Sequence, residues 1–192
     1  DHYQAVRKAW QKAVQAKQNK PLKDQLAAWA NFQKLLRSED RYFTEALRRE
    51  LLAIKDTITK RIQASYEELE KLEATYKPIT LEMRKPQNPR APFAAQAPKL
   101  LAMAKVAETI QSTAELVPNW DLGDKAETQV DRARSVLADH NDQARKLHNL
   151  YKLYHRLGKL RLARECLERV RVLGEAPSNP WYAEAVKILE GE

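Results

Sequence analysis

The feature that most constrains the fold is an uninterrupted stretch after Asp40. From Asp40 to Lys77 the sequence contains no Gly and no Pro. Apolar residues recur in this stretch at intervals of three and four, which is the spacing of one face of an α-helix. We call seven of them the long-helix seam: Phe43, Leu47, Leu51, Ile54, Ile58, Ile62 and Leu69. At 1.5 Å per residue such a helix is about 55 Å long, and its narrow apolar stripe needs a partner that covers it.

The segment before Asp40 offers one such partner. Helical apolar patterns precede and follow Asn19 and Pro21, and Pro21 suits the first position of a helix. Residues 1–77 are therefore predicted to form a long helical hairpin or a three-helix unit. A second chain, in a coiled-coil-like pair, is the other candidate partner. The heptad pattern is imperfect, with Thr57 and Thr59 beside the seam, and this favours the hairpin over self-association through the long helix.

Residues 78–98 differ in composition from what precedes them. Five of the nine prolines fall in this segment, at Pro78, Pro86, Pro89, Pro92 and Pro98. Proline fixes φ and lacks a backbone N–H. The segment is therefore predicted to be an extended, non-helical connector between two helical parts.

Residues 99–192 are predicted to form shorter helices. We expect helix ends at Pro118, Gly158 and Gly174, a helix start at Asp124, an interruption at 139–142, and a last helix opened by Asn179 and Pro180. The fold class that follows is all-α. It has a long hairpin-like or coiled-coil-like N-terminal part and a short C-terminal helical bundle.

One helix–turn–helix pattern stands out in the C-terminal part. Gly158 marks the turn, Ala163 is the small residue that lets two helices approach, and larger apolar residues occupy regular offsets: Leu147, Leu150, Tyr151, Tyr154, Leu167, Val170 and Leu173. Residues 147–173 resemble one tetratricopeptide repeat, although that family prefers a small residue where Tyr151 stands. The resemblance implies the end of a helical solenoid that binds a peptide or protein partner, without catalysis.

The basic residues are concentrated in the same region. Residues 143–173 carry nine Lys and Arg against two Glu, in a chain of net charge +8. On a helical projection, one basic stripe lies opposite the apolar set and is predicted to face solvent: Arg145, His148, Lys152, His155 and Arg156. Such a stripe is either a solvated face or a surface that attracts an acidic protein segment, nucleic acid or an anionic membrane.

Composition argues against several kinds of chemistry. The chain has only four glycines in 192 residues. Phosphate-binding loops and nucleophile elbows depend on glycine backbone, so neither is expected. Cys166 is the single cysteine and lies on an apolar helix face, so neither a disulfide nor a reactive thiol is expected. We predict no catalytic residues, no metal site and no cofactor.

The sequence therefore predicts a non-catalytic scaffold, adaptor or assembly factor that binds protein partners. A basic helical nucleic-acid-binding protein is the alternative, and the soluble part of a membrane-tethered assembly protein is another. Because the chain begins at Asp1 rather than Met, we expect a processed protein or a fragment. The cytoplasm is the favoured location, with a membrane-tethered or periplasmic location as the alternative.

Overall fold

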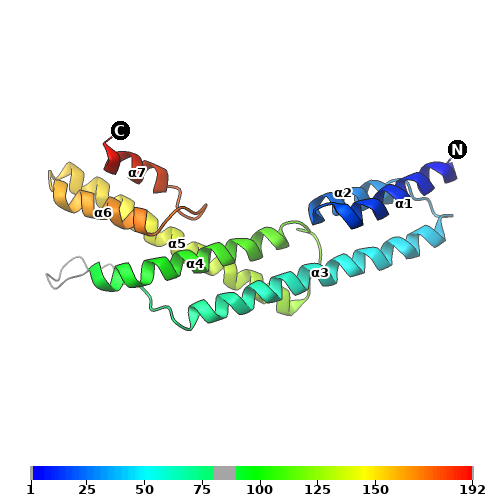
Figure 1. Cartoon of the computed structure of the whole chain (residues 1–192), viewed down its shortest axis with the longest axis horizontal. Helices are drawn as coiled ribbons and strands as arrows, with labels where there is room; N and C mark the ends of the chain where they lie inside the picture. The colour runs from blue at the N-terminus through cyan, green and yellow to red at the C-terminus, as the bar shows by residue number, and fades with distance from the viewer. Residues whose placement is uncertain (1, 80–89, 192) are drawn as a thin grey trace. The chain divides into compact units, whose positions relative to one another are not determined.

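The computed structural model describes residues 2–79 and 90–191, with the side chains of residues 90–92 excepted. Over these residues the chain is helical without any strand, which confirms the all-α fold class (Figure 1). The helices are α1 (His2–Asn19), α2 (Leu22–Gln33), α3 (Arg41–Glu73), α4 (Arg90–Ala114), α5 (Asp124–Arg156), α6 (Leu160–Val172) and α7 (Tyr182–Glu190). The chain divides into two compact units, Asp1–Ile58 and Thr59–Glu192.

The first unit is held together by an aromatic cluster. α1 and α2 contact each other on either side of the turn at Pro21. The Trp10 ring lies edge-on to Trp29 and Phe32, with centroids 5.2 and 5.3 Å apart, and Phe43 of α3 completes the cluster at 5.9 Å from Trp10. Such pairs contribute roughly 0.5–1.5 kcal/mol beyond their burial, so the rings fix how α1, α2 and the start of α3 pack.

The long-helix seam is covered within the single chain. Leu47, Ile54, Ile58, Ile62 and Leu69 are buried, and Phe43 and Leu51 are half-buried. In the first unit, α3 is tied to α1 by an ion pair between Lys17 Nζ and Glu50 Oε2 at 2.7 Å. A second chain is therefore not needed to cover these residues.

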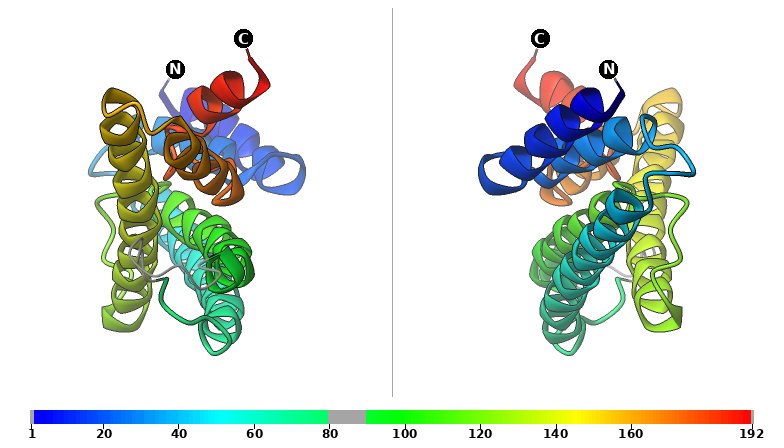
Figure 2. Two further views of the ribbon diagram at one scale, coloured as in Figure 1. Left: turned by 90° about the vertical axis from the view of Figure 1, so that its left-hand side faces the viewer. Right: turned by 90° about the vertical axis from the view of Figure 1, so that its right-hand side faces the viewer.

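In the second unit α5 is the central helix. It contacts both α4 and α6, and α6 in turn contacts α7 (Figure 2). The end of α3 joins this unit through polar contacts to α5: Gln129 Nε2 donates to Gln63 Oε1 at 2.7 Å, and Arg132 pairs with Glu73 at 2.6 Å.

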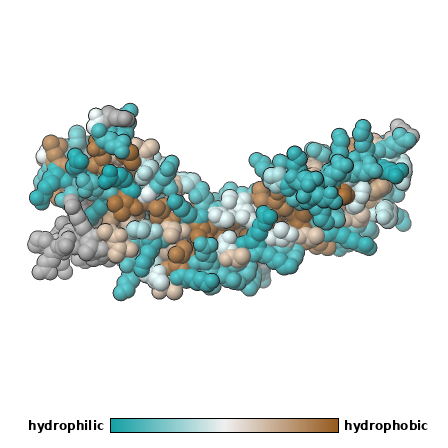
Figure 3. Space-filling view, in the orientation of Figure 1, coloured by the Kyte–Doolittle hydropathy of each residue, from teal (hydrophilic) through white to brown (hydrophobic). Residues whose placement is uncertain are grey.

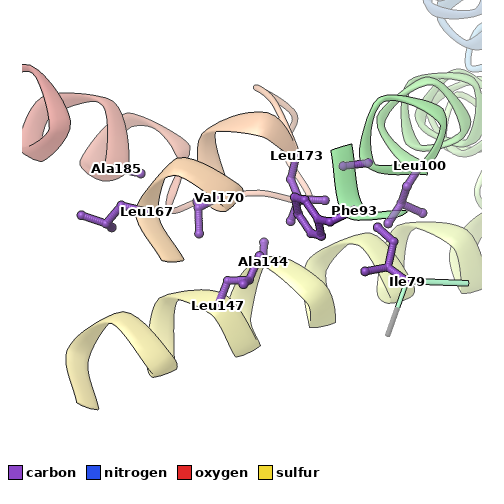
Figure 4. Close-up of a cluster of buried hydrophobic side chains, with 10 residues drawn as sticks. Ile79, Phe93, Leu100, Ala144, Leu147, Leu167, Val170, Leu173 and Ala185 are labelled. Atoms are coloured by element: carbon purple, nitrogen blue, oxygen red, sulfur yellow. The ribbon is translucent and has the colours of Figure 1, made fainter. Parts of the chain in front are cut away.

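A shared apolar core joins the helices of the second unit (Figure 4). Phe93 and Leu100 come from α4, Leu147 from α5, and Leu167 and Val170 from α6. The remaining buried members are Ile79, Ala97, Ala144, Leu173 and Ala185. Because one cluster contains side chains from α4 through α7, these helices form a single packed body.

The predicted connector at 78–98 is wrong over its last part. α4 begins at Arg90 and continues through Pro98. Pro92 lies in the first turn, where a backbone N–H has no intrahelical acceptor and its loss costs little. Pro98 interrupts the hydrogen-bond ladder, but Ala97 and Leu100 beside it are buried in the core, which offsets that cost. Pro86 and Pro89 lie outside the described residues.

The predicted helix interruption at 139–142 is also wrong, because α5 runs unbroken from Asp124 to Arg156. His140 is fully buried there, with Nδ1 2.8 Å from Ser178 Oγ and Nε2 3.0 Å from the Leu173 carbonyl oxygen. Asn141 Nδ2 donates to the Ser178 carbonyl at 3.2 Å. Side chains that suit a helix cap instead hold the loop after α6 against the middle of α5.

Asn179 has a different role from the predicted N-cap of the last helix. Its Nδ2 donates to the carbonyls of Val170 and Gly174, at 3.0 and 2.9 Å, and so caps the end of α6, while α7 begins at Tyr182. Gly158 and Gly174 do follow helix ends, with φ of 67° and 79°. These two predicted helix ends are confirmed.

The division between the two units does not coincide with the predicted boundaries at 77 and 98. It falls between Ile58 and Thr59, inside α3. Gly and Pro mark where a helix ends, whereas a compact unit is defined by packing, and one helix can contribute its two halves to two cores.

Candidate interaction surface

The connection between α5 and α6 is a tight and well-defined turn. The backbone N–H of Lys159 donates to the Tyr154 carbonyl at 2.9 Å, and that of Gly158 donates to the His155 carbonyl at 3.1 Å. These are the two hydrogen bonds of a Schellman motif, which requires the left-handed backbone that Gly158 adopts. The side chains around this turn are therefore presented on a fixed backbone.

Three leucines around this turn are exposed. The exposed fractions are 50% for Leu153, 58% for Leu157 and 64% for Leu160. Three exposed cations lie between or beside them in the sequence. We call these six residues the hairpin tip: Lys152, Leu153, Arg156, Leu157, Lys159 and Leu160. On the face seen in Figure 3, apolar surface lies among hydrophilic surface over α6 and α7 of this unit.

The charge of this region is of one sign. Between Asp142 and Glu165 the chain has no Asp or Glu, while it has seven cations: Arg145, Lys146, Lys152, Arg156, Lys159, Arg161 and Arg164. The cations at the base of the hairpin have anionic partners. Asp142 pairs with Arg145 and Lys146, both at 2.5 Å, and these two hydrogen bonds lower its pKa, with that from Lys146 the stronger cause.

The cations of the hairpin tip differ from those at its base. Among the described residues, no ion pair is found for Lys152, Arg156 or Lys159. Farther along α6, Arg164 Nε lies 3.4 Å from Glu168 Oε1. Positive charge that has no ion pair among the described residues is thus concentrated next to the exposed leucines.

Four of the five residues of the predicted basic stripe are exposed, namely Arg145, Lys152, His155 and Arg156. The structure adds that Arg145 is engaged by Asp142, while Lys152 and Arg156 belong to the hairpin tip. Their binding role stays a prediction.

His148 is the exception, and the prediction that it faces solvent is wrong. The residue is 3% exposed, and its ring stacks on Trp181 at a centroid distance of 5.5 Å. Its Nε2 lies 3.1 Å from Glu184 Oε2 of α7. Burial lowers the His148 pKa, Lys152 lowers it further, and Glu184 opposes this shift. The helical projection of α5 could not show that α7 returns to cover this position.

The exposed leucines were missed by the sequence reasoning. Leu153 and Leu157 are spaced i, i+4 but lie outside the apolar set formed by Leu147, Leu150, Tyr151 and Tyr154. Two leucines beside the apolar face of a helix indicate exposed apolar surface, since they make that face wider than one neighbouring helix can cover. Tyr151 and Tyr154 are half-buried.

The residues that could support catalysis or metal binding are few. Burial raises the pKa of the Cys166 thiol to about 11, so the thiol stays protonated near neutral pH. In the described part of the chain, no three side chains of His, Cys, Asp or Glu converge as metal ligands would. None of the described helices combines the length and the apolar character that crossing a bilayer requires.

Comparisons with known proteins give no family assignment. No family model, no curated protein and no solved structure matches this chain.

Proposed function

We propose that this protein is a non-catalytic interaction module, a scaffold or adaptor, whose hairpin tip binds an acidic and partly apolar surface of a protein partner. The observation that carries the proposal is the combination of Leu153, Leu157 and Leu160, each at least half exposed, with neighbouring cations that lack a described ion pair. The proposal concerns the second unit, in which the hairpin tip lies.

The exposed leucines supply the affinity in this proposal. Burying a fully exposed leucine side chain contributes about 1.5–3 kcal/mol, so leucines exposed by half to two-thirds contribute roughly 1–2 kcal/mol each. An apolar cluster rimmed by polar residues is typical of a protein–protein contact. Because the Schellman turn fixes the backbone, little ordering entropy opposes the contact.

The cations determine which partner is preferred. Lys152, Arg156 and Lys159 surround the leucines with positive charge, which steers acidic partners towards the hairpin tip and disfavours basic ones. Proteins that bind single-stranded nucleic acid stack bases on outward-facing aromatic rings, whereas Tyr151 and Tyr154 are half-buried here. The observations therefore favour an acidic protein over nucleic acid.

The tetratricopeptide resemblance of residues 147–173 is part of the same proposal. In a solenoid each repeat covers its neighbour, and the terminal repeat needs a polar or occupied outer face. The repeat-like helix pair consists of the end of α5 and all of α6. Its first helix is therefore not a separate element but the C-terminal part of α5, which has 33 residues. The exposed leucines support an end of a helical array that still accepts a further apolar surface.

The test uses a synthetic acidic amphipathic helix, with one leucine face and one glutamate face, labelled for fluorescence anisotropy. We expect saturable binding to the full chain that weakens as salt is raised. Leu153→Ser combined with Leu157→Ser should weaken it roughly tenfold or more. Lys152→Glu combined with Arg156→Glu should have an effect of similar size and reduce the salt dependence.

A matched control separates the hairpin tip from overall charge. Lys8 and Lys12 are exposed on α1 with the same i, i+4 spacing as Lys152 and Arg156, so Lys8→Glu combined with Lys12→Glu should leave binding unchanged. An equal loss in this control, or no loss in the leucine variant, refutes the proposal. Tight binding of a labelled oligonucleotide, independent of the leucines, would support the nucleic-acid alternative instead.

A further inference from the structure

Two adjoining hollows in the second unit are lined by α4, α5 and the connection between them, and the second hollow also by Pro177 and Ser178 before α7. One has a volume of about 390 Å³ and the other about 490 Å³, and Glu115 lines both. We call the combined surface the acidic groove, and its lining includes the carboxylates of Glu108, Glu115 and Glu127 and the apolar side chains of Val117, Trp120 and Leu137. It is thus both apolar and negatively charged.

The charge of the acidic groove is opposite to that of the whole chain. Four carboxylates line it against one guanidinium, Arg134, which is paired with the fourth carboxylate, Asp131, at 3.0 Å. Glu115 accepts a hydrogen bond only from the neutral Gln111 amide, at 2.8 Å, among its described contacts. In a chain of net charge +8 this is a local excess of negative charge, and it attracts a cationic surface with apolar side chains.

The hairpin tip is a surface of that kind. We propose that the hairpin tip of one molecule docks in the acidic groove of a second copy of the chain. This inference rests on the proposed function and names its partner. The leucines of the tip would meet the apolar lining of the groove, and Lys152, Arg156 and Lys159 would meet the carboxylates of Glu108, Glu115 and Glu127.

The contact cannot form within one molecule. α5 carries both surfaces: Asn141 is the groove residue nearest the tip on this helix, and Lys152 is the first residue of the tip. The 11 positions from Asn141 to Lys152 correspond to about 17 Å along a continuous helix. A rigid helix keeps the two surfaces apart, so only a second molecule brings a tip to a groove.

The geometry of the contact has a consequence for assembly. A tip in a groove joins two different surfaces, so the contact is heterologous and each pair keeps one free tip and one free groove. Association should therefore continue beyond the dimer as concentration rises. It should weaken with added salt, since exposed charges are screened.

The test is sedimentation velocity of the full chain over a wide concentration range, at low and high salt. We expect mass to grow beyond the dimer at low salt. A groove variant, Glu108→Lys with Glu115→Lys, and a tip variant, Leu153→Ser with Leu157→Ser, should each weaken association about a hundredfold. The control Lys8→Glu with Lys12→Glu should associate like the wild type. Circular dichroism verifies that each variant is folded.

Mixing the two variants gives the sharpest outcome. The groove variant keeps a native tip and the tip variant keeps a native groove, so the mixture should form dimers and nothing larger. A wild type that stays monomeric while binding the acidic peptide overturns this inference and leaves the proposed function intact. Association that neither variant weakens, or a mixture that stays monomeric, also overturns the inference.

Discussion

Substituting His140 tests whether a buried neutral imidazole holds the loop after α6 to α5. Nε2 must carry the ring proton, because its partner, the Leu173 carbonyl oxygen 3.0 Å away, can only accept. Nδ1 then accepts from the Ser178 hydroxyl at 2.8 Å. His140→Ala removes two hydrogen bonds, each contributing about 1 kcal/mol net, and leaves a cavity. We expect the free energy of unfolding to fall by about 3–4 kcal/mol.

The same residue predicts how stability depends on pH. Burial lowers the His140 pKa, opposed by its hydrogen bond to Leu173, and burial lowers the His148 pKa as well. Between the folded and unfolded pKa values the unfolded chain binds more protons, so stability rises with pH there. The stability contributed by the neutral histidines is fully present above the pKa of an unfolded histidine, about 6.5. This stability is lost as the pH falls from about 6.5 towards the pKa of the folded protein. At a pH of about 5.5 the loss is at most about 1.4 kcal/mol of unfolding free energy for each histidine.

Urea unfolding near pH 7.5 and pH 5.5 measures both effects. His140→Gln keeps an amide donor without a titrating ring, so it should retain more stability than His140→Ala at the higher pH. It should also lose less stability on acidification than the wild type, with the residual loss due to His148. If the wild type is equally stable at both values, or if His140→Gln shows the full acid loss, the assignment of a buried neutral His140 is refuted.

Three further predictions concern stability and reactivity. Leu147 is fully buried and Leu153 is half exposed on the same helix. In urea titrations the free energy of unfolding should fall by about 2–5 kcal/mol in Leu147→Ala and by less than about 0.5 kcal/mol in Leu153→Ala. Equal losses in the two variants would contradict the assigned faces of α5. The buried Cys166 thiol, with its pKa raised to about 11, should resist a disulfide reagent in the native chain and react on unfolding; rapid native labelling would show the site to be open. Gly158→Ala, at a φ of 67°, should cost about 1–2 kcal/mol by thermal melting, and a neutral effect would contradict the Schellman turn.

The existence of the helices followed from the sequence, because their signals are local. The spacing of the long-helix seam indicates one continuous helix, and α3 runs from Arg41 to Glu73. Gly158 and Gly174 end helices because a left-handed residue closes the last turn. Such signals depend on neighbours within about four residues, so a single sequence contains them in full.

The predictions that were wrong have the opposite cause, because contacts between residues distant in the sequence determine the structure at those positions. Pro98 is helical because its neighbours are buried in a core that includes residues from α6 and α7. His140 and Asn141 continue a helix because residues 173 and 178 satisfy their side chains. The acidic groove combines residues of α4 and α5 that lie up to 33 positions apart. No local pattern contains these partners.

His148 and His155 show what a helical projection of a single helix can predict and what it cannot. The two lie seven positions apart, nearly in register on one face of α5, yet His148 is buried and His155 is exposed. The difference arises because Trp181 and Glu184, which lie at the start of α7, meet α5 at His148. Leu153 and Leu157, which follow His148 on α5, are 50% and 58% exposed, so α7 does not cover the hairpin tip. The same short helix thus buries one predicted site residue and leaves open the surface that the interaction proposal requires.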